Sequence, residues 1–152
     1  MLQTSFIRQN KEQVLEGLAK RNFKDAEQMI EKVLLLDDTR KATQNTLDNN
    51  LAELNSLAKE IGDMFKSGRA GEAAPLKEKT AALKAQSKEL EERLSATEKE
   101  LQDLLYLIPN VPYKLVVQGF GAEDNQEVFA EGAIPELFEG AMPHWNWPRN
   151  MI

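Results

Sequence analysis

Residues 33–64 read VLLLDDTRKATQNTLDNNLAELNSLAKEIGDM, and this stretch decides the fold. Steps of three and four alternately pick out one helix face, which is apolar except at three positions. The face consists of Val33, Leu36, Arg40, Thr43, Leu47, Asn50, Leu54, Leu57, Ile61 and Met64. This spacing is typical of a coiled-coil seam. A helix of this length spans roughly 48 Å at ~1.5 Å per residue, so we expect an extended rod rather than a globular core.

A second seam follows a glycine-containing segment. The segment Ser67-Gly68-Arg69-Ala70-Gly71 allows the chain to reverse, and Pro75 suits the first turn of a new helix. The second seam consists of Leu76, Thr80, Leu83, Ser87, Leu90, Leu94, Thr97, Leu101, Leu104 and Ile108. Two seams of similar length joined by a short turn predict an antiparallel two-helix hairpin. A parallel dimer of one continuous helix would have to run through Gly68, Gly71 and Pro75, and is therefore disfavoured.

A shorter helix is expected before the hairpin. Asn10 is placed as its N-cap, with Gln13 reciprocating in a capping box. The apolar face of this helix consists of Val14, Leu15 and Leu18. The long helix is expected to begin near Lys24 or Asp25. The predicted fold class is therefore all-α, with a short N-terminal helix packed at the base of a coiled-coil hairpin.

The chain changes character after Pro109, which ends the second long helix. Prolines and glycines recur at turn-like spacing, and the tail has no obvious core of its own. Lys114-Leu115-Val116-Val117 and Glu127-Val128-Phe129 are candidate short strands. We expect a helical domain over residues 1–108, with the arm at about 25–108, and an irregular linker over 109–152 that leads toward a further domain.

The composition excludes several kinds of site. The 152 residues include no cysteine and a single histidine, His144, so disulfides, Cys-bound zinc and a two-imidazole site are excluded within one chain. No run approaches the ~20 apolar residues of a membrane span, and no secretory signal is evident at the start. A cytoplasmic protein without membrane contact is expected. The net charge of −6 argues mildly against non-specific nucleic-acid binding.

The charge is nevertheless polarised along the predicted rod. Residues 59–88 carry seven basic and four acidic side chains, whereas 24–58 carry four against seven and 89–108 carry two against six. On the second helix three lysines spaced by seven and four form one stripe beside the seam. The candidate RNA-binding residues are Lys59, Lys66, Arg69, Lys77, Lys84 and Lys88. The alternative for any single lysine is that it solvates the seam or pairs across it.

No catalytic or metal site is predicted. Gly119-Phe120-Gly121 is too short for a phosphate loop and lacks the Gly-Lys-Ser/Thr ending, so it is interpreted as a turn. His144, between Pro143 and Trp145, has no accompanying nucleophile or carboxylate motif, and a packing or interface role is favoured. The polar seam residues Arg40 and Asn50 are interpreted as fixing register.

Several stretches together resemble a known family. They are Ile7-Arg8-Gln9-Asn10, Leu36-Asp37-Asp38-Thr39-Arg40-Lys41, Leu54-Asn55-Ser56-Leu57-Ala58-Lys59-Glu60-Ile61-Gly62, Ile108-Pro109-Asn110-Val111-Pro112, Glu123-Asp124-Asn125-Gln126-Glu127-Val128 and Pro143-His144-Trp145. Their order, over residues from about 5 to 145, resembles the N-terminal domain of bacterial-type seryl-tRNA synthetases. Two stretches depart from the family pattern, namely Lys114-Leu115-Val116 and Asn146-Trp147-Pro148-Arg149. The second departure suggests a shortened or altered C-terminal end.

The resemblance implies a recognition role within a larger enzyme. In the family this arm holds the long variable arm and elbow of serine tRNA across a homodimer. A separate class II catalytic domain attaches serine to tRNA with ATP and Mg²⁺. That domain's signature motifs have no counterpart here, so the chain alone is predicted to be inactive and without a cofactor, and its own oligomeric state, a monomer included, stays open.

A second hypothesis comes from a different class of protein. The hairpin would then be a structural or chaperone-like coiled coil that assembles with other copies and binds no RNA. A prefoldin-like chaperone specifically would need strands between the helices, and residues 66–75 are too few for a β-hairpin.

Overall fold

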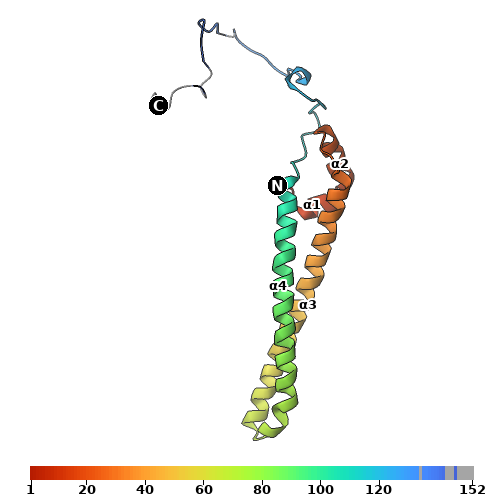
Figure 1. Cartoon of the computed structure of the whole chain (residues 1–152), viewed down its shortest axis with the longest axis vertical. Coiled ribbons are helices and arrows are strands. Elements are labelled where there is room, and N and C mark those ends of the chain that lie inside the picture. Colours follow the sequence, from red (N-terminus) through yellow and green to blue (C-terminus); the bar gives the residue numbers. More distant parts are fainter. Residues whose placement is uncertain (134, 143–145, 147–152) are drawn as a thin grey trace.

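A computed structural model describes residues 1–133, 135–142 and 146, and shows a long helical hairpin with two short helices at its base (Figure 1). Helices α3 and α4 lie side by side and run antiparallel. The elements in chain order are α1 (Thr4–Gln9), α2 (Lys11–Lys20), α3 (Ala26–Lys66), η1 (Ala70–Ala73), α4 (Ala74–Leu107) and η2 (Ala122–Asp124). None of the described residues forms a strand. The predicted all-α hairpin is confirmed.

The heptad spacing explains how α3 and α4 pack. Every position of the two predicted seams is buried or half-buried, which confirms the register of the coiled coil. Helix α3 has 41 residues and α4 has 34, so their lengths are roughly 62 and 51 Å. The hairpin therefore extends far beyond the region in which other helices can pack against it.

The main apolar core lies at the base of the hairpin, where four helices meet. Its buried members are Ile7, Val14, Leu18, Ile30, Val33, Leu101, Leu105 and Ile108. Leu105 lies beside the predicted seam rather than on it. A straight helix drifts relative to a seven-residue repeat, and α1 and α2 add apolar partners outside the two-helix interface at this end.

The reversal at the distal end depends on Gly68. Its φ of +75° is a left-handed conformation that glycine adopts without strain. The Gly68 amide donates to the Phe65 carbonyl at 3.2 Å, and the Arg69 amide donates to the Met64 carbonyl at 2.9 Å. These two bonds form a Schellman motif that ends α3. Pro75 occupies the first turn of α4, as predicted.

One local prediction about a helix end was wrong. The chain forms an additional helix, α1, before Asn10, and the Asn10 side-chain amide donates to the Phe6 carbonyl of α1 at 3.1 Å. The side chain therefore satisfies the end of α1 and makes no capping box for α2. The predicted start of the long helix near Lys24 or Asp25 is confirmed, since Asp25 directly precedes α3; it has a left-handed φ of 54° and makes no side-chain capping bond.

The segment after α4 is irregular, and the two suggested strands are not formed. The Lys20 ammonium donates to the carbonyls of Lys114 and Val116, each at 3.1 Å. The Asn22 amide donates to the Gly119 carbonyl at 3.1 Å. These bonds from the end of α2 satisfy backbone groups that a strand would pair with a neighbouring strand.

Some predictions concern residues outside the described part of the chain. They are the packing role of His144 and the interruption expected at Trp147-Pro148-Arg149. Across the described residues, no helix combines the length and the apolar character that crossing a bilayer requires.

Candidate nucleic-acid interface

The six predicted RNA-binding residues fall into separate groups. Lys77, Lys84 and Lys88 are exposed along one stripe of α4. Lys59 of α3 lies two residues from both Leu57 and Ile61 of the seam, which is about 200° of helix rotation. It therefore points away from α4, as does Lys66 one heptad later, and Arg69 is exposed in the turn. Only the α4 lysines form a continuous stripe.

One edge of the hairpin is closed by ion pairs between the two helices. The Lys32 ammonium of α3 lies 2.8 Å from the Glu100 carboxylate of α4. Toward the distal end, the Lys79 ammonium of α4 lies 2.5 Å from the Glu53 carboxylate of α3. We call these two pairs the ion-pair edge. Charges beside this part of the seam satisfy one another, as flanking positions of coiled coils usually do.

Toward the distal end, the opposite edge carries lysines that form no ion pair among the described residues. The Lys77 ammonium lies 4.8 Å from the centroid of the Phe65 ring. The antiparallel register sets Lys84, one heptad further along α4, opposite Ala58 of α3. We define the lysine edge as Ala58, Phe65, Lys77, Lys84 and Lys88. The α3 residues of this edge, Ala58 and Phe65, are apolar and offer no carboxylate to the lysines of α4.

Ion pairing of the distal cations supports this division. In the described structure the distal ion pairs are Lys79 with Glu53, and Lys66 with Asp63 at 3.6 Å. Lys59, Arg69, Lys84 and Lys88 have no carboxylate partner among the described residues. Their charges are therefore available to an external polyanion.

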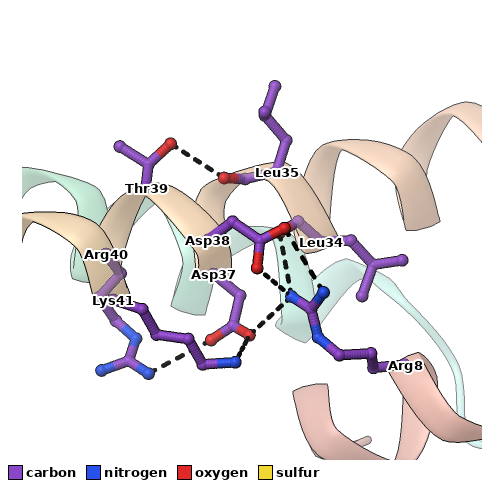
Figure 2. A network of polar contacts seen from close by, with 8 residues as sticks. All are labelled: Arg8, Leu34, Leu35, Asp37, Asp38, Thr39, Arg40 and Lys41. Atoms are coloured by element: carbon purple, nitrogen blue, oxygen red, sulfur yellow. Dashed lines mark hydrogen bonds and ion pairs between the residues drawn. The ribbon is translucent and has the colours of Figure 1, made fainter.

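At the base, charged side chains instead form ion pairs and hydrogen bonds with one another (Figure 2). The Arg8 guanidinium of α1 lies 2.5 Å from Asp38 and 3.1 Å from Asp37, both on α3. Arg40 at 3.2 Å and Lys41 at 2.6 Å also contact the Asp37 carboxylate. We call this group the Arg8–Asp37 network. It fixes α1 against α3 and assigns Arg40 a local structural role.

Burial and hydrogen bonding act in opposite directions on Asp37. Its side chain is 1% exposed, and burial by itself would raise the pKa of the carboxyl group. Hydrogen bonds from Lys41, Arg8 and Arg40 outweigh that effect and lower the pKa below its ordinary value. Hydrogen bonds to Asp38 and then Asp37 raise the pKa of the Arg8 guanidinium. Both shifts favour the charged forms of Asp37 and Arg8.

The glycine-containing turn at residues 119–121 is closed by a carboxylate of the same chain. The amides of Phe120 and Gly121 donate to the Asp124 carboxylate at 2.7 and 3.3 Å. These two amides are therefore already bonded to an anion within the chain. Within the described residues, no group of three or more His, Cys, Asp or Glu side chains is arranged to hold a metal.

A family model described as the seryl-tRNA synthetase N-terminal domain matches residues 1–112. The chain belongs to the seryl-tRNA synthetase N-terminal domain family. Similar proteins include the serine–tRNA ligases of Cellvibrio japonicus, 36% identical over 91% of this chain, and Azorhizobium caulinodans, 36% identical over 84%. These alignments cover 31% and 29% of the relatives. The chain thus spans about a third of the length of the class II ligases that it matches.

A solved structure agrees with the sequence comparison. The crystal structure of seryl-tRNA synthetase from Pyrococcus horikoshii, complexed with ATP, superposes with a TM-score of 0.71 and 27% identity. The match covers 82% of this chain and 28% of that chain. The N-terminal domain fold is therefore shared with that enzyme.

The seryl-tRNA synthetase family also gives the Arg8–Asp37 network a context. Two of the stretches that resemble the family, residues 7–10 and 36–41, contact each other through this network. The sequence did not predict this contact, because about thirty residues separate Arg8 from Asp37 and Asp38. Opposite charges in both stretches were the only signal that they could meet.

Proposed function

We propose that this chain is the tRNA-binding arm of a serine–tRNA ligase and contacts serine tRNA through the distal half of its hairpin. The observation that carries this proposal is the unpaired lysine edge, which faces an ion-pair edge on the other side of the same two helices. Proteins recognise double-stranded RNA largely through phosphates and shape. A stripe of exposed lysines suits that mode of binding better than a pocket does.

The distribution of charge favours the distal end over the base. The base regions 24–58 and 89–108 both carry more acidic than basic side chains, and several of their cations are held in ion pairs. An RNA backbone would be repelled there and attracted to residues 59–88. The variable arm and elbow of serine tRNA are the RNA features assigned to this surface.

The remaining functions of the ligase belong to other regions. We assign recognition to residues 1–108, and to residues 109–152 the connection to a catalytic domain. That domain would use ATP and Mg²⁺ to attach serine to tRNA, in a homodimeric cytoplasmic enzyme. The present chain contributes no catalytic residue, and serine-dependent exchange of pyrophosphate into ATP is expected to be absent from the pure chain.

The decisive experiment is a fluorescence anisotropy titration of labelled serine tRNA at several salt concentrations. The triple variant Lys77→Glu, Lys84→Glu, Lys88→Glu should bind at least tenfold more weakly, and the slope of log K against log salt should fall by about three. The matched control reverses three base lysines, Lys24, Lys32 and Lys99, and should retain most of the affinity.

Two outcomes would contradict the proposal. Equal binding by the unaltered chain and the lysine-edge variant would remove the edge from the interface. Equal binding of serine tRNA with and without its variable arm would remove the claim of specificity.

The chaperone-like assembly hypothesis makes the opposite prediction in sedimentation. A hairpin that assembles with other copies should sediment as an oligomer whose size does not change when tRNA is added. A tRNA-binding arm should shift only when tRNA is present.

A further inference from the structure

We propose that the Phe65 ring, held by Lys77 at the distal end of the arm, is a stacking platform for an exposed nucleobase. This inference deepens the proposed function and rests on it. It assigns one contact to the face of a base, in addition to contacts between lysines and the RNA backbone.

Phe65 is unusually placed for an apolar side chain. It lies one residue before the end of α3, and it is 50% exposed although the neighbouring seam residue Met64 is half-buried. The Lys77 ammonium lies 4.8 Å from the ring centroid, within the range of a cation–π contact. This contact restrains the ring while about half of the side chain remains accessible.

The surroundings of the ring favour a nucleic acid over a protein. On the lysine edge the ring is followed by Lys77 and Lys84, and the nearby Asp63 is already paired with Lys66. An exposed aromatic ring beside lysines that lack carboxylate partners matches the surface that proteins use for single-stranded nucleic acid, where bases stack and the backbone follows the charges. A protein partner would be expected to need a larger apolar patch.

Two sources could supply the base face. One is an unpaired base in a loop, and the other is the outer face of a base pair at the end of a stacked helix. Both expose the same π surface at a point where the phosphates remain within reach of Lys77 and Lys84.

The first test compares Phe65→Ala, Phe65→Leu and Phe65→Trp in the full chain, with serine tRNA as the probe. Loss of stacking should weaken binding roughly tenfold in the Ala variant, and the Leu variant should stay weak because it restores apolar area without a π face. The Trp variant should bind at least as well as the unaltered chain. The slope of log K against log salt should not change, because no charge is removed.

A matched control is Tyr106→Ala, which removes another exposed aromatic ring, 66% accessible, from the base end of α4. It should leave tRNA affinity unchanged. Thermal unfolding of each variant followed by circular dichroism should match that of the unaltered chain, because both rings are largely exposed.

A direct readout uses Phe65→Trp in a chain whose Trp145 and Trp147 are replaced by Phe. Adding tRNA should quench the emission of this single tryptophan, as expected for stacking on a base. Titrations with a looped hairpin RNA and with a blunt RNA duplex separate the two sources. Dependence on Phe65 for either RNA supports the platform, and dependence for neither overturns it.

The outcomes separate this inference from the proposed function. Normal binding by Phe65→Ala or Phe65→Leu, with binding still lost in the lysine-edge variant, would overturn the platform alone. No tRNA binding by the unaltered chain would overturn both.

Discussion

The base of the hairpin and its distal end use the same two helices but are stabilised differently. At the base, α1 and α2 pack against α3, and residues of all four helices form one core around fully buried side chains such as Leu18 and Ile30. At the distal end only α3, η1 and α4 are present, and most of the seam positions are half-buried. Stabilisation increases with the apolar surface that folding buries. The base therefore contributes more of the free energy of folding than the distal end does.

The polar groups differ in the same direction. At the base the Arg8–Asp37 network satisfies its charges internally, whereas the lysine edge leaves its cations free of carboxylates. Toward the distal end the seam also includes Ser87, whose buried hydroxyl has no hydrogen-bond partner. The molecule therefore combines a base whose charges are satisfied internally with a distal region whose exposed lysines are suited to an external partner.

The largest expected effect comes from removing a core side chain at the base. Ile30→Ala should lower the free energy of unfolding by about 3–4 kcal/mol, because Ile30 is fully buried among four helices. Leu83→Ala, in the two-helix distal region, should cost about 2 kcal/mol, because its site can collapse or admit water more easily. Urea unfolding followed by circular dichroism measures both. A larger loss for Leu83→Ala would reverse the comparison.

The next effect tests the charged network at the base. Asp37→Asn should cost about 2 kcal/mol at pH 7, less than for a fully buried pair because its three cationic partners are partly exposed. The folded-state pKa of Asp37 is lowered, so its contribution is present above the ordinary pKa and is lost as pH falls through the folded value. The difference between the two proteins should therefore shrink below about pH 4.

The control for that experiment is Asp103→Asn. Asp103 pairs only with Lys99 on the exposed face of α4 at 3.2 Å, and such pairs contribute at most about 0.5 kcal/mol. Thermal unfolding between pH 3 and 7 gives both comparisons. An unchanged gap between Asp37→Asn and the unaltered chain down to pH 3 would show that the carboxylate charge is not its source.

The smallest expected effect has the opposite sign. Ser87→Ala should raise the stability by up to about 1 kcal/mol, because it removes a buried hydroxyl that lacks a partner. Thr97 is a matched seam position whose hydroxyl donates to the Arg93 carbonyl at 2.8 Å. Thr97→Val should therefore destabilise slightly under the same conditions. Destabilisation by both changes would indicate that the Ser87 hydroxyl is satisfied in solution.

Much of the fold follows from periodicity in the sequence. The heptad spacing correctly predicted which faces of the two long helices are buried. Gly68 and Pro75 correctly predicted where the chain reverses. The six-residue helix α1 was not predicted, because a helix of that length is stabilised by tertiary packing rather than by its own pattern. The suggested strand at 114–117 failed for a related reason, since Lys20 satisfies its carbonyls.

The candidate site was less accessible to sequence reasoning. The charge distribution along the sequence predicted a basic distal region. It could not show that Lys59 and Lys66 lie on a different face from the lysines of α4. The contrast between the two edges depends on which residues face each other across an antiparallel pair. Phe65 gave no signal at all, because an apolar residue beside a seam residue is ordinarily interpreted as part of the packing.

The length of the hairpin has a mechanical consequence. About 32 residues separate Val33 in the base core from Phe65, which corresponds to roughly 48 Å along α3. A tilt of only about 5° at the base would displace the Phe65 ring by about 4 Å over that distance, more than the whole span of a hydrogen bond. Small angular errors where Arg8 meets Asp37 therefore become large positional errors at the far end, and the accuracy of the distal contacts is set at the base.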